Sequence, residues 1–298
     1  MSRIIKLIAD DNYISLRNYL KSNKISTSMV RRLKRTENGI MLNGNSVFTN
    51  TPVNKGDIII LKLEDKCIVH EVDCDLELNI IYEDDDYILV NKPSGIAVHP
   101  TSTIKNNTLK NAFDTYCKKN NLNLIFRPVY RLDKNTSGIL VIAKNQLAVS
   151  MYKDAVKKYI AFCHGKTKDE DTITSKIDLE ENSFIKRKTD DLNGKNAITH
   201  YKNLFSNDKY SALELSLETG RTHQIRVHMS SIGHPLVGDD LYGGNRELMN
   251  RQALHCFYIK FKNQISGKII ECSCELPSDM NLFIEKYLSG FRSDNIVY

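Results

Sequence analysis

Most of this sequence is divided into short apolar and β-branched runs that are separated by turn-forming residues. Residues 210–218 alternate apolar and polar side chains, which is the pattern of a strand with one buried face. Similar runs predict strands at residues 158–163, 197–204 and 269–276. Few helical stretches lie between these strands, so the sequence predicts an α+β fold with a mixed, largely antiparallel sheet.

Two helices and one hairpin are expected in the same part of the chain. Apolar residues recur at helical spacing over residues 109–116, before Pro128. A second helix is predicted over residues 146–157, with these residues on its inner face: Leu147, Met151 and Ala155. An acidic turn between two apolar runs predicts a hairpin over residues 80–90.

The net charge of +6 is unevenly distributed along the 298 residues. Residues 1–69 contain twelve Lys and Arg against six Asp and Glu, so the remaining residues are neutral in sum. This asymmetry indicates a basic accessory segment that meets a polyanion. Charge alone leaves open a second interpretation, a solvated basic surface without a partner.

The basic segment has the pattern of a small ααβ module. A short helix is expected at residues 15–20, and Ser26 or Thr27 can cap a second helix that ends by Gly39. Four cations cover the polar faces of this second helix: Arg31, Arg32, Lys34 and Arg35. A strand, an Asn-Gly turn and a second strand follow over residues 40–47, and another strand ends at residue 61.

The two short helices, the "LNG" hairpin and the "NKGDIIIL" ending resemble the S4 family of RNA-binding domains. The resemblance covers residues 13–70 and implies that the four cations of the second helix contact RNA. A small folded cap without RNA is the alternative. Residues 71–79 are predicted to be a linker, and residues 80–298 the second domain.

A single carboxylate stands out in the second domain. Asp133 lies two residues after Arg131 and shortly before the Thr-Ser-Gly turn at residues 136–138, which leads into the apolar run 139–143. An aspartate at the mouth of a strand can be presented to a ligand, and a nearby guanidinium can bind phosphate. The same pattern also describes an ordinary turn, in which glycine supplies an unusual dihedral angle.

Four segments of the second domain resemble the RluA family of RNA pseudouridine synthases when they are taken together. They are "LVNKPSGIAVHP", "RLDKNTSG", "KKYIA" and "TGRTHQIRVHM", and the match spans most of residues 80–276. The resemblance implies isomerisation of a uridine within RNA, in which the N1 glycosidic bond breaks and the sugar is rejoined through C5. With an S4-like module in front, the order of domains resembles the branch that acts on large-subunit ribosomal RNA.

The resemblance also implies residue roles. Asp133 matches the catalytic aspartate, which acts either as a nucleophile or as a base at the ribose. Arg131 matches the residue that fills the space left by the flipped base. Tyr159 matches a tyrosine that stacks on the uracil, Arg226 an arginine that pairs with the carboxylate, and Ile225 is expected to line the apolar pocket wall.

Without the resemblance, some of these residues have simpler interpretations. Tyr159 would be as well explained as a tyrosine of the core, and Arg226 would be a surface charge on a helix. Tyr130 stands where the family commonly has histidine. Because it precedes the residues with assigned roles, we expect it to alter packing or substrate preference and to leave the chemistry intact.

Other motifs point away from cofactors. The seven cysteines contain no Cys-x-x-Cys pair and the histidines lack ligand spacing, so we expect no metal and no redox cofactor. His223 and His228 are interpreted as structural or RNA-contacting. The segment 92–95 lacks the spacing of a phosphate-binding loop and is expected to shape the site near Asp133.

No apolar run approaches the roughly 20 residues of a membrane span. We therefore expect a cytoplasmic monomer that binds RNA, most plausibly ribosomal RNA. The alternative from another class is a non-catalytic RNA-binding or ribosome-assembly factor with the same fold. An unrelated hydrolase using Asp133 would need a second carboxylate or a Ser/His pair, and neither is matched in the sequence.

Overall fold

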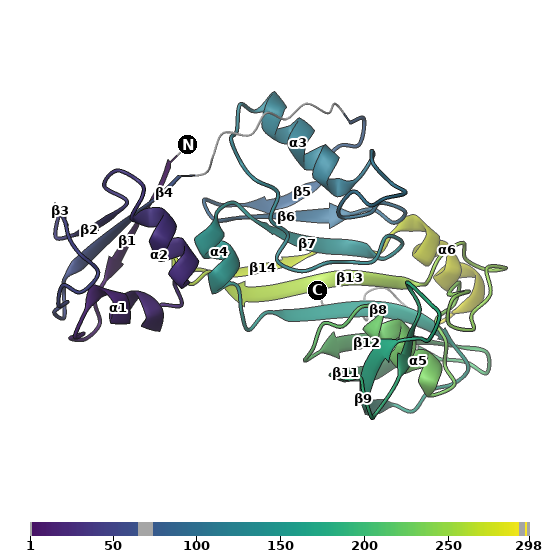
Figure 1. Ribbon diagram of the computed structural model, residues 1–298. Coiled ribbons are helices and arrows are strands. Elements are labelled where there is room, and N and C mark those ends of the chain that lie inside the picture. The colour runs from purple at the N-terminus through teal and green to yellow at the C-terminus, as the bar shows by residue number, and fades with distance from the viewer. Residues whose placement is uncertain (1, 65–73, 292–295, 297–298) are drawn as a thin grey trace.

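The computed structural model describes residues 2–64, 74–291 and 296, and it arranges them in two parts, each with its own sheet (Figure 1). The predicted α+β class is confirmed, and the larger sheet is antiparallel at every pairing except that of β13 with β7. The predicted linker, residues 71–79, lies partly outside the described residues.

The N-terminal part is a four-stranded sheet covered by two short helices. The strand order is β1-β4-β2-β3. Ser26 caps the second helix through its side chain, as the sequence predicts, and Ser15 caps the first helix in the same way. One strand, β1, precedes the predicted range 13–70 and pairs with β4 along its whole length. The elements are β1 (Ser2–Ile8), α1 (Leu16–Ser22), α2 (Thr27–Leu33), β2 (Ile40–Leu42), β3 (Asn45–Ser46) and β4 (Ile58–Glu64).

The larger part contains a ten-stranded sheet in the order β10-β9-β11-β12-β8-β13-β7-β6-β5, with β14 paired to β13. Its first elements are β5 (Ile80–Glu83), β6 (Tyr87–Lys92), α3 (Leu109–Lys119), β7 (Ser137–Ala143), α4 (Gln146–Met151), β8 (Val156–His164) and β9 (Glu170–Leu179). The others are β10 (Arg187–Thr189), β11 (Lys195–Ser206), β12 (Tyr210–Leu217), α5 (Gln224–Ser231), β13 (Leu254–Lys262), β14 (Ile269–Ser273) and α6 (Ser278–Tyr287).

The predicted helix over residues 146–157 is wrong in its second half. Helix α4 ends at Met151, Tyr152 has extended backbone angles, and Asp154 has a positive φ of 52°. Strand β8 begins at Val156 and pairs with β13, so hydrogen bonds across the sheet replace the last helical turns. Helical spacing of three apolar residues could not reveal this competition from a strand that is distant in sequence.

Helix α4 forms the contact between the two parts. Leu147 and Met151 are buried in the same apolar cluster as the core of the N-terminal part, which includes Leu20 and Leu61. Figure 1 shows α4 beside this part. The apolar face of α4 therefore packs across the boundary between the two parts.

A buried carboxylate adds a polar contact at this boundary. Asp86 is 1% exposed and accepts hydrogen bonds from Asn145 at 2.9 Å and Asn263 at 3.2 Å. Arg3 of β1 reaches the same carboxylate at 3.4 Å. A buried carboxylate with several donors is costly to disturb, so this network fixes β1 against the larger part.

Strand β7 carries the Asp133 turn into the core. All seven of its residues are buried. Gly138 has a φ of 114°, and a side chain there would overlap the backbone of Cys256 on β13. The glycine of the Thr-Ser-Gly turn is thus required by the close parallel approach of β7 and β13, in addition to its unusual dihedral angle.

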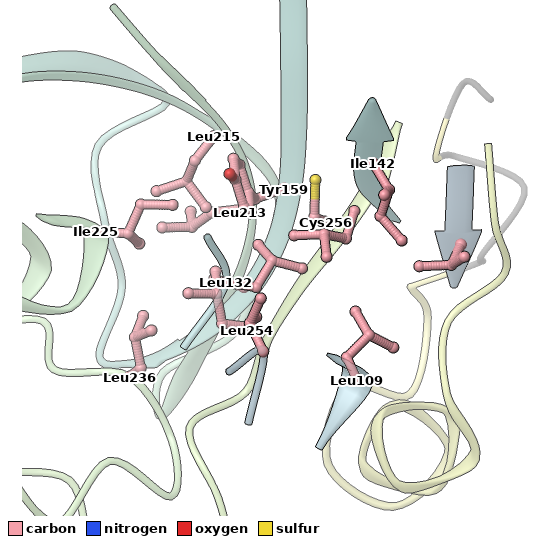
Figure 2. Close-up of a cluster of buried hydrophobic side chains, with 14 of the residues drawn as sticks. Leu109, Leu132, Ile142, Tyr159, Leu213, Leu215, Ile225, Leu236, Leu254 and Cys256 are labelled. Atoms are coloured by element: carbon pink, nitrogen blue, oxygen red, sulfur yellow. The ribbon is translucent and has the colours of Figure 1, made fainter. Parts of the chain in front are cut away.

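An apolar cluster lies beneath the turn. Figure 2 shows side chains from the two halves of the sheet converging there, and they include Leu132, Tyr159, Leu213, Ile225 and Leu254. Because these residues come from segments that are far apart in sequence, the cluster fixes the turn, β8 and α5 relative to one another.

We expect Leu147→Ala to lower the free energy of unfolding by about 2–5 kcal/mol, because it removes a fully buried side chain from the boundary cluster. Urea unfolding measures this loss. The matched control is Leu192→Ala, since Leu192 is 87% exposed. An equal effect of the two substitutions would show that packing of α4 on the N-terminal part contributes no stability.

Candidate active site

A pocket of about 840 Å³ opens at the Asp133 turn. Its walls come from the loop after β6, the turn before β7, β8, the segment before α5, and Ile185 near the β9–β10 connection. The pocket brings together all five residues that the sequence assigns to catalysis and substrate binding: Arg131, Asp133, Tyr159, Ile225 and Arg226. A volume of this size lies within the usual range for ligand sites.

Arg226 is the buried centre of the site. It lies on α5 with 7% exposure, so it is not a surface charge. Two of its nitrogens donate to the two carboxylate oxygens of Asp239, each at 2.7 Å, and its Nη1 lies 3.4 Å from Oδ2 of Asp133. The strong bidentate pair is therefore with Asp239, and the contact with Asp133 is longer.

The two neighbouring carboxylates keep the buried Arg226 charged. Burial lowers the pKa of Arg226, but hydrogen bonds and charge from Asp239, together with the charge of Asp133, raise it overall. Asp239 is 1% exposed and thus a fully buried counter-ion. The sequence patterns indicated no role for Asp239.

Lys92 ties the loop after β6 to the Asp133 turn. Its Nζ donates to the backbone carbonyls of Pro93 at 2.8 Å, Ile96 at 2.9 Å and Lys134 at 3.0 Å. Burial lowers the pKa of this fully buried lysine to about 7, against the opposing charge of Asp133. The structure places the Lys92 segment beside the Asp133 turn, where the sequence expects it.

The other side of the turn is held by the segment before β13. Arg251 donates to the carbonyl of Asn135 at 3.3 Å and forms a bidentate pair with Asp279 of α6 at 2.6 and 2.9 Å. Gln252 donates to the hydroxyl of Thr136 at 3.2 Å. These contacts fix the backbone around Asp133, so its side chain is presented from a rigid turn.

Tyr159 lines the pocket from β8 and is 5% exposed. Burial raises the pKa of its hydroxyl well above the ordinary value, and the nearby Cys256 thiol adds to this effect. The phenol is therefore neutral at neutral pH. Its ring is available to the pocket as an apolar surface.

Tyr130 lines the pocket and is half-buried, with its side chain packed against neighbouring groups. Its hydroxyl donates to the carbonyl of Ile139 at 2.7 Å, its ring stacks on Tyr152, and the Lys157 ammonium lies 4.3 Å from the ring centre. These contacts give the tyrosine a packing role between β7 and β8. Such a role agrees with our expectation that the residue affects packing.

Arg131 is exposed at the pocket and has no hydrogen-bond or ion-pair partner among the described residues. The four cations of the N-terminal part do not line the pocket. Helix α2 ends at Leu33, so Lys34 is its C-cap and Arg35 lies beyond it. The prediction that placed both on the helix is corrected here, because Arg35 and Thr36 donate to carbonyls only three residues back and tighten the chain into a turn.

His223 was missed as a neighbour of the carboxylate. It immediately precedes α5, and its Nε2 lies 3.8 Å from Oδ2 of Asp133. Spacing in the sequence could not indicate this contact, because the two residues are brought together only by the packing of α5 on the Asp133 turn.

The part of the chain that the structure describes contains neither a metal-binding cluster nor a membrane-spanning helix. No group of three or more His, Cys, Asp and Glu in that part of the chain is placed to hold a metal ion. None of the helices described there is both long and apolar enough to cross a membrane.

Comparison with known proteins identifies the family. The family profile described as RNA pseudouridylate synthase matches residues 86–231. The chain is 38% identical over 259 residues to the uncharacterized RNA pseudouridine synthase YhcT of Bacillus subtilis, covering 84% of this chain and 85% of YhcT. It is 36% identical over 248 residues to ribosomal large subunit pseudouridine synthase D of Zymomonas mobilis, covering 75% and 77% of the two chains.

A solved structure agrees with these sequence relatives. Human RNA pseudouridylate synthase domain containing 1 superposes with a TM-score of 0.56 at 27% identity, over 70% of this chain and 86% of that chain. The fold is that of an RNA-modifying isomerase. The chain belongs to the RNA pseudouridine synthases of the RluA type, enzymes of the EC 5.4.99 class that isomerise uridine in RNA.

The two aspartates that contact Arg226 should differ sharply in their effect on stability. Asp239→Ala leaves a buried guanidinium without its bidentate partner, and we expect a loss of about 3–5 kcal/mol in the free energy of unfolding. Asp133→Ala should cost less than about 1 kcal/mol, because this carboxylate is partly exposed and its contact is long. Chemical denaturation of both variants tests the contrast, and equal losses would contradict it.

Proposed function

We propose that this enzyme converts specific uridines of large-subunit ribosomal RNA to pseudouridine, with Asp133 as the catalytic carboxylate. The proposal rests on Asp133, the one carboxylate among the described residues that lines the pocket. This side chain is partly exposed, lies on a rigid turn and contacts the buried Arg226. Relatives named ribosomal large subunit pseudouridine synthase D support the choice of RNA. Such a substrate implies a cytoplasmic enzyme.

The target base must leave the RNA stack to reach the pocket, which costs a few kcal/mol. The exposed Arg131 guanidinium is placed at the pocket mouth, where a planar cation can occupy the vacated space and contact phosphate. Inside, Tyr159 offers a ring face to the uracil and Ile225 an apolar wall. These surfaces limit the access of water to an activated sugar.

The chemistry then requires one group at the ribose. Asp133 assists cleavage of the bond between C1′ and N1, either by attacking the sugar or by removing a proton from it. After rotation of the uracil, C5 bonds to C1′, which releases the Asp133 carboxylate if it had attacked the sugar. The C5 proton is lost to solvent, and N1 takes up a proton. Arg226 orients the carboxylate during these steps.

The cations at Arg31, Arg32, Lys34 and Arg35 are proposed to bind the RNA backbone outside the pocket. Three of them are exposed, and α2 belongs to a part that packs on α4. The N-terminal part would thus hold RNA in a defined position relative to the pocket. An S4-like RNA-binding role for this part rests on the sequence resemblance and on this exposed charge.

We expect Asp133→Asn to abolish product formation while the protein stays folded. Unmodified ribosomal RNA is incubated with enzyme, and pseudouridine is mapped chemically. The wild type should modify defined positions, and the variant should show no product even at stoichiometric enzyme. Equal modification by both proteins would remove Asp133 from the mechanism, whereas binding without product in the wild type would favour the non-catalytic alternative.

Neutralising the four cations should weaken RNA binding chiefly through counterion release. The logarithm of affinity should depend less steeply on the logarithm of salt concentration, with the slope reduced by roughly 3. Binding is measured by filter retention between low and physiological salt. The matched control replaces four exposed lysines elsewhere with glutamine: Lys118, Lys119, Lys268 and Lys286. A slope unchanged in the first variant, or equally reduced in the control, would contradict a specific RNA role for these cations.

Substitution is preferable to deletion for this test. Removing residues 1–64 would expose Leu147 and Met151, which are buried against the N-terminal part. A truncated chain would therefore confuse loss of RNA contacts with loss of stability.

A further inference from the structure

The two oxygens of Asp133 have different surroundings. Oδ2 faces Nη1 of Arg226 at 3.4 Å and Nε2 of His223 at 3.8 Å. Among the described residues, no group forms a hydrogen bond or ion pair with Oδ1. One oxygen is thus held by the protein, and the other is left for the substrate.

His223 is held in an unusual conformation to make this contact. Its φ of 58° and ψ of 18° are left-handed, and its side chain makes no capping hydrogen bond to α5. A non-glycine residue in this region carries strain of about 1 kcal/mol or more. The side chain instead points its Nδ1 toward the hydroxyl of Tyr242, 2.9 Å away, with the two rings edge to face.

The tyrosine hydroxyl determines which nitrogen of the neutral imidazole carries its proton. The backbone N–H of Arg187 on β10 donates to the Tyr242 oxygen at 2.8 Å. Because the Arg187 N–H already occupies one acceptor site of the oxygen, we assign the phenolic proton to the contact with Nδ1 of His223, which then accepts it. The imidazole then carries its proton on Nε2, the nitrogen that faces Asp133.

We propose that His223 is a positioning residue for catalysis: with its tautomer set by Tyr242, it presents an Nε2–H group to Oδ2 of Asp133 and thereby directs Oδ1 toward the ribose. This inference rests on the proposed function of Asp133. At 3.8 Å the Nε2–H group lies just beyond hydrogen-bond distance from Oδ2, so it acts as a weaker neutral donor beside the charged one that Arg226 supplies, and the carboxylate is flanked on two sides.

The charges around His223 support a neutral ring. Burial lowers the pKa of His223, and the neighbouring guanidinium groups of Arg226 and Arg187 lower it further, whereas Asp133 and Asp239 oppose them. The net direction is downward from the ordinary value of 6.5, so the ring is neutral at pH 7. Below the lowered pKa of His223 the ring would be protonated. It would then carry a full positive charge beside Asp133, and the proton on Nδ1 would compete with the Tyr242 hydroxyl proton.

The test compares His223→Gln, His223→Phe and Tyr242→Phe in single-turnover and steady-state assays on the same RNA. Glutamine retains an N–H donor that does not titrate, and phenylalanine retains only bulk. We expect His223→Phe to lower kcat roughly 10- to 100-fold with little change in KM, the range found for groups that orient a functional side chain. His223→Gln should recover much of this loss. His200→Gln, at an exposed histidine of β11, is the matched control and should behave as wild type.

The pH profile provides a readout that a packing role would not move. Wild-type kcat should fall as the pH is lowered through the depressed pKa of His223, below 6.5. His223→Gln should lack this decline. Identical acid limbs in the two proteins, or equal impairment of the glutamine and phenylalanine variants, would overturn the inference.

Nitrogen-15 NMR of labelled histidine tests the tautomer without RNA or turnover. The wild type should show the Nε2-protonated form at pH 7, and Tyr242→Phe should lose this preference. An Nδ1-protonated wild type would refute the proposal. If instead wild-type enzyme gives no pseudouridine at all, the proposed function fails, and the NMR result stands separately from it.

Discussion

The rest of the site depends on the pairing of the Arg226 guanidinium with two carboxylates. The guanidinium is buried and charged, and such a group is tolerated only where its donors are satisfied. Asp239 satisfies two of them with ideal bidentate geometry and leaves Nη1 facing Asp133. This division gives the two carboxylates separate tasks, since one stabilises the buried cation and the other remains partly exposed to the pocket.

Close backbone packing of β7 against β13 places Asp133 beside Arg226. Gly138 allows β7 to lie against β13, and the neighbouring turn is fixed from one side by Lys92 and from the other by Arg251. A carboxylate on a rigid turn needs little reorganisation when it meets substrate. The pocket is therefore organised by backbone contacts as much as by its lining side chains.

Local patterns in the sequence predicted the elements well and their ends less well. Alternation identified β12, and a hydroxyl cap at Ser26 identified the start of α2, because both signals depend on neighbouring residues. The end of α4 was wrong because β13, about one hundred residues away, recruits residues 156–158 into the sheet. Strand β1 was not expected, since its partner β4 is also remote along the chain.

Contacts between distant residues were also missed at the site. The five residues that the motifs indicated line one pocket, whereas Asp239 and His223 contact the site only through packing formed by folding. Tyr130, unexplained by its motif, is accounted for by packing between β7 and β8. Short-range patterns identify residue types, and the partners of buried charges depend on tertiary structure.

The most direct measurement of the central claim is release of tritium from RNA that carries uridine labelled at C5, under single-turnover conditions with Asp133→Asn. Isomerisation must expel the C5 hydrogen, so release reports the reaction itself. We expect rapid release of tritium by the wild type and none by the variant, with equal RNA affinity for both proteins. Release by the variant at a rate close to that of the wild type would contradict this expectation.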